Sequence, residues 1–235
     1  GVARNITRAL IGKVLGQGGG SSLDLAQAIQ WAVDEGAHII SMSLGIDYPG
    51  AVKRIVNEQG LEIEPATSIA LEAYRANINL FTQLTRYVQA QGPFGQGTII
   101  VAASGNESRR PGYEVAVAPP AAGTGVISVG ALQQGDSSLS VADFSNDQVN
   151  ISAPGVDVLS AWIGGKLQRI DGTSMATPHV AGVAALWAQK QLQERGSVDN
   201  QLLTSRLISS GSMQPLSTES KPEDVGSGIV QAPIN

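Results

Sequence analysis

Two uninterrupted apolar runs constrain the fold of this chain more than any other feature. They are Thr98 to Ala103 (TIIVAA) and Val126 to Leu132 (VISVGAL). Each run predicts a strand buried on both faces, because a strand with one exposed face alternates apolar and polar residues. Strands buried on both faces are typical of a parallel sheet that is covered by helices.

Segments with helical periodicity alternate with these runs. Apolar residues recur at helical spacing from Leu25 to Val33, after a serine that can cap the helix and before Gly36. The apolar stretch Lys13 to Leu15 precedes this helix and the β-branched stretch His38 to Leu44 follows it, which predicts a strand–helix–strand unit. Further helices are predicted over Ile69 to Val88 (closed by Gly92 and Pro93), Met175 to Lys190 and Gln201 to Ser209, while Asp47 to Ala66 is predicted to be irregular.

The composition indicates one globular domain and excludes several classes of protein. Hydrophobic residues make up 42% of the 235 residues and charged residues 15%, so the chain can bury a full-sized core. The net charge of −5 offers no basic footprint for nucleic acid, and no apolar run approaches the ~20 residues of a membrane helix. The chain has no cysteine, which excludes a disulfide framework, a thiol nucleophile and a thiolate metal site.

The glycine run Gly16 to Gly20 raises the alternative of a nucleotide-binding domain. The dinucleotide fingerprint requires glycine where Ser21 stands, and no Lys-Ser or Lys-Thr pair follows as in a phosphate loop. We therefore interpret the run as a turn.

The stretch Asp171 to Gly182 (DGTSMATPHVAG) carries the strongest chemical signal. It places the hydroxyl of Ser174 in the first turn of a helix, where unpaired N–H groups and the helix dipole favour negative charge. A serine there can attack a carbonyl, because its own N–H can hold the resulting oxyanion. Taken alone, a serine at a helix start is usually only a cap.

The whole string resembles the nucleophile segment of the subtilisin-like serine peptidases, the subtilases. Val101 to Glu107 (VAASGNE) is similar to the strand end that carries the family's oxyanion-hole asparagine, and Ser41 to Gly45 (SMSLG) is similar to its substrate-binding strand. The likeness continues in family order through Phe144 to Asn146 (FSN), Ile151 to Gly155 (ISAPG) and Gly226 to Ala232 (GSGIVQA).

The resemblance implies a fold and a set of site residues. The fold is three-layer α/β, with a mostly parallel central sheet flanked by helices, in one domain over residues 1–235 with an insertion at approximately 47–66. Ser174 is the nucleophile, and Asn106 stabilises the oxyanion. One wall of the substrate pocket consists of Ser43, Leu44 and Gly45, and the other of Ala103, Ser104 and Gly105. Because no carboxylate stands among these wall residues, we expect a preference for apolar over basic side chains.

Two members of the family's catalytic triad have no counterpart here. The family order is Asp, His, Ser, and this sequence begins where the histidine segment should already have passed, so we expect a fold incomplete at its N-terminal side. There is no Asp-x-Gly at a strand end and no His-Gly-Thr-His string. His179 lies beyond Ser174 by more than one helical turn, and His38 begins the substrate-binding strand at its far end, so neither is expected to act as the general base. Asp171 is expected to be a solvated turn carboxylate.

Three explanations of this gap stay open. The chain is the later part of a larger serine endopeptidase, or it works with a second chain that supplies Asp and His, or it is a non-catalytic, peptide-binding relative. We favour the first, because the nucleophile, the oxyanion residue and the pocket walls are retained together. For this chain alone we expect little activity, since Ser174 lacks a base, and we expect association through exposed apolar sheet surface.

The expected partner is a peptide or protein substrate, not nucleic acid or a membrane, and no cofactor is required. Structural calcium occurs in many relatives, but no EF-hand-like spacing is formed by Asp24, Asp47, Asp136, Asp143 and Asp157. Family tendency favours secretion or the cell envelope, although Gly1 to Leu10 lacks the apolar core of a signal peptide.

Overall fold

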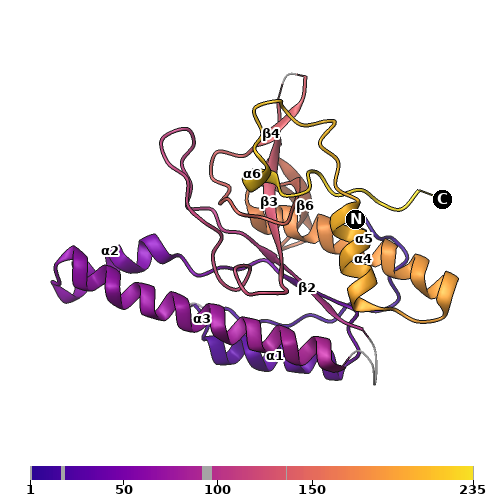
Figure 1. Cartoon of the computed structure of the whole chain (residues 1–235), viewed down its shortest axis with the longest axis horizontal. Coiled ribbons are helices and arrows are strands. Elements are labelled where there is room, and N and C mark those ends of the chain that lie inside the picture. Colours follow the sequence, from indigo (N-terminus) through magenta and orange to yellow (C-terminus); the bar gives the residue numbers. More distant parts are fainter. Residues whose placement is uncertain (1, 17–18, 92–96, 136, 235) are drawn as a thin grey trace.

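The centre of the fold is a five-stranded, mostly parallel sheet (Figure 1). The structure, a computed structural model, describes residues 2–16, 19–91, 97–135 and 137–234. Strands β1 (Ile39–Met42), β2 (Ile99–Ala103) and β3 (Ile127–Gln134) are parallel neighbours, β5 (Ile151–Pro154) runs parallel to β3, and the short β4 (Leu139–Val141) pairs antiparallel with β3. The two apolar runs are therefore central strands, as predicted.

Helices cover both faces of this sheet. One face carries α1 (Ser22–Asp34) and the long α3 (Ile63–Gln91), and the other carries α4 (Thr173–Arg195) and α5 (Asn200–Ser209). Successive side chains of a strand point to opposite faces. Along β2, Ile99 and Val101 accordingly pack with α4 and α5, while Ile100 and Ala102 pack with α1 and α3. The predicted three-layer α/β fold is confirmed.

The segment predicted to be irregular, residues 47–66, is helical, so that prediction is wrong. It contains α2 (Tyr48–Gln59) and the first turn of α3. Asp47 caps α2 by accepting a hydrogen bond from Gly50 N, and Gly60 ends the helix with a left-handed φ of 65°. Both prolines of the segment lie in first helical turns, where proline is tolerated. The residues that suggested a loop are thus residues of helix ends. Together, α2 and the first half of α3 form a helical arm that extends beyond the sheet (Figure 1).

The predicted strand at Lys13 to Leu15 is also wrong. Residues 9–15 belong to no strand of the described chain, which leaves β1 at the edge of the sheet. Only Val14 packs against the core on the α1 and α3 side, whereas Ile11 is 86% exposed. A strand is stabilised by a row of backbone partners, and a three-residue apolar stretch with one core contact does not secure them.

Two helix-end predictions have different outcomes. Ser21 caps α1 in a capping box with Asp24, as predicted for one of the two serines there. The predicted end of the long helix at Gly92 and Pro93 lies outside the described residues. So do residues 17–18 of the glycine run, whose flanking Gly16 and Gly19 pair as an isolated bridge.

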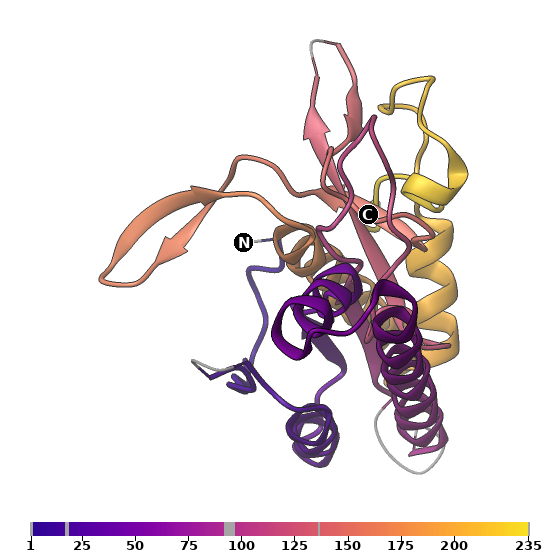
Figure 2. The same cartoon turned by 90° about the vertical axis from the view of Figure 1, so that its left-hand side faces the viewer.

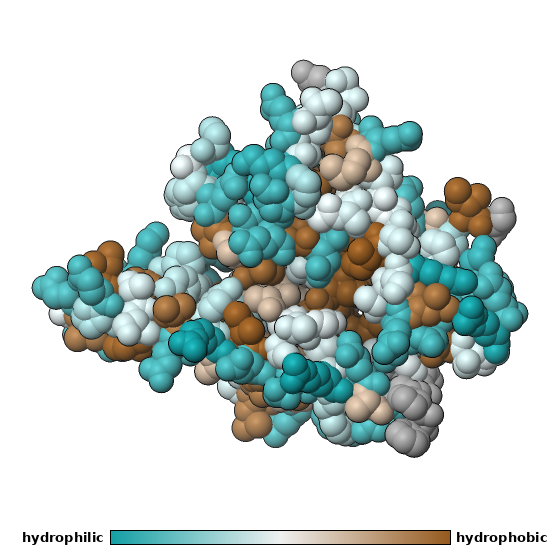
Figure 3. Space-filling model, in the orientation of Figure 1, coloured by the Kyte–Doolittle hydropathy of each residue, from teal (hydrophilic) through white to brown (hydrophobic). Residues whose placement is uncertain are grey.

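Strands β6 (Val158–Trp162) and β7 (Lys166–Ile170) form a hairpin that projects from the body (Figure 2). It pairs with no other strand of the part of the chain that the structure describes. Ile163 and Leu167 on it are 85% and 69% exposed. Exposed hydrophobic residues also lie on the helical arm, where Figure 3 shows them among hydrophilic ones. No described helix has the length and apolar character needed to span a membrane.

The hairpin should make the chain associate in solution, because it combines exposed apolar side chains with the marginal stability of two unsupported strands. Replacing Ile163 and Leu167 by Ser should lower the average mass measured by size-exclusion chromatography with light scattering at several concentrations. The control is Ile234→Ser, which removes an equally exposed apolar side chain (90%) far from the hairpin in sequence. An equal loss of association in the control would contradict a role of the hairpin.

Candidate functional site

Ser174 lies in the first turn of α4, at the edge where the parallel strands of the sheet end. Gly172 precedes the helix with a φ of 151°, a conformation that glycine adopts without steric cost. Its N–H donates to Gly155 O at 2.8 Å, directly after β5. The glycine therefore starts α4 against the carboxyl end of the sheet, and Ser174 is left half-buried.

A proline inside α4 alters the backbone environment of Ser174. Pro178 has no N–H, so the Ser174 carbonyl lacks the donor that residue i+4 normally supplies. The Ser43 hydroxyl donates to this carbonyl at 2.9 Å instead. The Ser174 hydroxyl donates back to the Ser43 carbonyl in a long bond of 3.4 Å. Two hydrogen bonds thus join Ser174 to the end of β1.

Asn106 follows the end of β2 and contacts the residue before Ser174. Its Oδ1 accepts hydrogen bonds from Thr173 N at 2.8 Å and from Thr173 Oγ1 at 2.9 Å. Asn106 is exposed, and its Nδ2 donates to no described residue. A side-chain amide with a fixed oxygen and a free –NH₂ is a ready donor to an incoming oxygen atom.

The two predicted wall segments meet at this helix start. Ser43 contacts Ser174, and Gly105 N donates to Thr173 Oγ1 at 3.3 Å. The other wall residues differ in exposure. Ala103 and Ser104 are buried, Leu44 packs against the core on the α1 and α3 side, and Gly45 is exposed. The structure therefore brings one residue of each wall into contact with the start of α4, Ser43 with Ser174 and Gly105 with Thr173.

Neither histidine is hydrogen-bonded to Ser174 in the described chain. His179 donates from Nδ1 to Met175 O at 2.8 Å, so its ring folds back onto its own helix. His38 lies at the opposite end of β1 from Ser43, and burial lowers its pKa. Asp171 is exposed and accepts a hydrogen bond from Asp157 N at 2.7 Å, at the base of the hairpin. No described group is placed to take the Ser174 proton.

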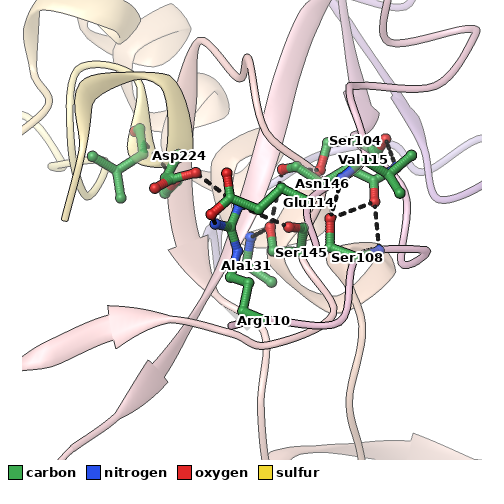
Figure 4. Close-up of polar contacts among 11 residues, drawn as sticks. Ser104, Ser108, Arg110, Glu114, Val115, Ala131, Ser145, Asn146 and Asp224 are labelled. Atoms are coloured by element: carbon green, nitrogen blue, oxygen red, sulfur yellow. Dashed lines mark hydrogen bonds and ion pairs between the residues drawn. The ribbon is translucent and has the colours of Figure 1, made fainter. Parts of the chain in front are cut away.

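Two residues that sequence reasoning missed hold the loop around Asn106. The fully buried Asn146 accepts hydrogen bonds at Oδ1 from Glu107 N (3.0 Å) and Ser108 N (3.1 Å). Its Nδ2 donates to Ser104 O at 3.2 Å (Figure 4). The same Nδ2 donates to Glu107 Oε2 at 2.7 Å. Glu107 Oε2 also accepts from Asn106 N at 3.0 Å. The string Phe144 to Asn146 indicated likeness to the family, but it did not indicate that Asn146 contacts the loop around Asn106.

The Glu107 carboxylate lies next to one of the predicted wall residues, Gly105. Gly105 has a φ of 115°, and any side chain there would collide with the Asn146 amide and the Glu107 carboxylate. A negative charge therefore borders a wall residue. No carboxylate stands among the wall residues themselves, but the Glu107 carboxylate lies beside Gly105, so the preference for apolar side chains stays a prediction.

A cluster of charged residues fastens the segment that follows this loop (Figure 4). Arg110 forms ion pairs with Asp224 at 2.7 Å and with Glu114 at 2.5 Å. The carboxylate of Asp147 lies close to both acidic residues, and its pKa is raised by burial and by their negative charges. Calcium takes six to eight oxygen ligands. The cluster does not fit that ion, because the Arg110 guanidinium already neutralises two of its three carboxylates.

Comparison with known proteins finds proteases among the relatives of this chain. The sequence is 35% identical to the thermostable alkaline protease of Halalkalibacterium halodurans, over 74% of this chain and 38% of that protein. It is also 35% identical to the thermophilic serine proteinase of a Bacillus species, over 81% of this chain and 38% of that protein. The chain therefore spans well under half the length of these relatives.

Solved structures share the fold. Sphericase superimposes with a TM-score of 0.60 at 32% identity, covering 85% of this chain and 58% of that one. The S41 psychrophilic protease gives a TM-score of 0.67 at 27% identity, covering 93% of this chain and 67% of that one. The sequence model of the Subtilase family matches residues 1–214. With nearly the whole chain matched and the fold shared, this chain belongs to the subtilase family.

Proposed function

We propose that this chain is the serine-bearing part of a subtilisin-type serine endopeptidase, with Ser174 as its nucleophile. The observation that carries the proposal is the pair of hydrogen bonds from Thr173 to Asn106 Oδ1. It leaves a free amide donor beside the residue that precedes Ser174. The protease names of the relatives support the same reaction class.

In the proposed reaction, Ser174 Oγ attacks the carbonyl carbon of a peptide bond while its proton passes to a general base. The carbonyl oxygen becomes an oxyanion, which accepts hydrogen bonds from Asn106 Nδ2 and Ser174 N. Ser174 N is in the first turn of α4, where N–H groups have no helical acceptor. The C–N bond then breaks, the amine leaves with the proton from the base, and water hydrolyses the acyl–serine. Because both donors are held in place before the reaction, they stabilise the oxyanion without reorganisation.

The proposed substrate is an extended peptide lying along Ser43 to Gly45. These residues continue β1, which is an edge strand in the described chain. An edge strand can bind an extended peptide through backbone hydrogen bonds, with side-chain pockets adding selectivity. The second wall, Ala103 to Gly105, continues from β2, the strand paired with β1.

We also propose that the chain alone is nearly inactive. A serine hydroxyl without an adjacent base is a poor nucleophile. Among the described residues, the Ser174 hydroxyl has only a long hydrogen bond to a carbonyl oxygen, which cannot take its proton at neutral pH. The Asp and His would come from a preceding segment of the same gene product or from a second chain.

A non-catalytic, peptide-binding protein is the second candidate. It is favoured by the lack of a base beside Ser174 among the described residues. The reading frame upstream of Gly1 separates the two candidates. A strand-end Asp-x-Gly and a His-Gly-Thr-His string there would refute the non-catalytic reading, and an upstream sequence without them would refute the endopeptidase unless a second chain restores labelling.

The product of the whole reading frame should react with a fluorophosphonate at Ser174, detected by mass spectrometry. Asn106→Ala should slow this labelling by about 10²–10³-fold, the known effect on turnover of removing the equivalent donor in subtilisin itself. Ser174→Ala is the control that must abolish labelling. If the folded whole product gives no labelling, Ser174 is not a nucleophile; if Asn106→Ala labels at the normal rate, Asn106 is not the oxyanion donor.

The chain of 235 residues, tested alone, should label far more slowly than the whole product, because the base is missing. Adding a polypeptide that carries the Asp and His segments should raise the rate, and its His→Ala variant should not. Equal labelling rates of the isolated chain and the whole product would mean that this chain contains its own base.

A further inference from the structure

Residues 117–119 connect the two predicted pocket walls from behind. Ala118 N donates to Ser104 O at 2.8 Å, which ties the segment to the second wall. Ile46 N, directly after Gly45, donates to Pro119 O at 2.9 Å, which ties the segment to the first wall. Ala118, Pro119 and Ser104 are all buried. The separation of the walls therefore depends on where this bridging segment sits.

Tyr74 reaches this bridging segment from α3. Its hydroxyl donates to Val117 O at 2.8 Å. Its ring also contacts Tyr48 edge-on, with ring centroids 5.5 Å apart and an interplanar angle of 66°. Tyr48 lies at the start of α2, two residues after Ile46. One side chain thus contacts both the bridging segment and the chain that leaves the first wall.

The protonation of the Tyr74 hydroxyl and the packing of its helix both favour this contact. Burial, with a smaller effect of the neighbouring Tyr48, raises the pKa of Tyr74, so its hydroxyl stays protonated and can donate. The helix that carries it is 29 residues long and packs on the sheet through Phe81 and Val88. Tyr74 therefore links a long helix that packs on the sheet to the bridging segment.

We propose that Tyr74 is a positioning residue that sets the separation of the two substrate-binding walls, and with it the size of side chain that the site selects. The proposal rests on the proposed function, because it takes both walls as substrate-binding. Without the hydroxyl, Val117 O loses its donor, while Val117 N keeps its bond to Asp147 O at 3.1 Å. The segment would stay attached but less closely fixed.

The test uses Tyr74→Phe, which removes the hydroxyl and keeps the ring against Tyr48. Tyr87→Phe is the matched control, because Tyr87 is exposed on the same helix and has no hydrogen bond to a described residue. The first measurement is amide hydrogen exchange at Ile46 and Ala118. The second is binding, by NMR titration, of three peptides that differ only by Ala, Leu or Phe at one position.

In Tyr74→Phe, the two amides should exchange about 2- to 10-fold faster and the affinity ratio between the peptides should fall by a similar factor, as for one lost hydrogen bond. Tyr87→Phe should change neither. If the unaltered chain discriminates among the peptides and Tyr74→Phe keeps both its exchange rates and its affinity ratios, the positioning role is overturned. If the unaltered chain binds none of the peptides, the assignment of the walls in the proposed function fails instead. Faster exchange in Tyr74→Phe would then still support the bridge itself.

Discussion

The hydrogen bond from Thr173 N to Asn106 Oδ1 is the contact on which the candidate site depends. It joins the end of β2 to the start of α4 across 67 residues of sequence. Such a contact requires a parallel sheet, whose strands all end at one edge, and a helix that begins at that edge. Gly172 makes the helix begin there, since its φ of 151° is a conformation that other residue types rarely adopt, and its N–H is bonded to Gly155 O.

A missing helical hydrogen bond in α4 leads to the contact between Ser174 and the end of β1. The proline at position 178 leaves the Ser174 carbonyl without a helical donor. The Ser43 hydroxyl supplies that donor. The same proline that weakens the helix thus gives the end of β1 a fixed partner, and the serine lies between two anchored strand ends.

Much of the fold could be predicted from the sequence, because burial leaves a clear pattern. The runs that became β2 and β3 had to be buried on both faces, and the periodic segments had to be helices. The pattern failed where local chemistry decided the structure. Asp47 and Gly60 cap a helix that composition alone presents as a loop, and Lys13 to Leu15 is apolar but has no partner strand among the described residues. The hairpin of β6 and β7 exposes both apolar and polar residues, so burial left no pattern from which it could be predicted.

The candidate site could be predicted in part. Likeness of short strings to the family named Ser174, Asn106 and the wall segments, and the structure brings Ser43, Asn106 and Thr173 around Ser174. The supporting contacts could not be predicted, because they join residues far apart in sequence. Asn146 holds the Asn106 loop from 38 to 42 residues away, and the Glu107 carboxylate lies beside the wall residue Gly105.

In the proposed mechanism, Ser174, Asn106 and the Ser174 N–H form one preorganised oxyanion site. The most direct test is a crystal structure of the whole reading-frame product bound to a peptide boronic acid, whose boron adds to a serine oxygen as a tetrahedral analogue. We expect a bond from boron to Ser174 Oγ, with one boronate oxygen within hydrogen-bond distance of both Asn106 Nδ2 and Ser174 N. A boronate bound elsewhere, or one whose oxygens point away from Asn106, would contradict it.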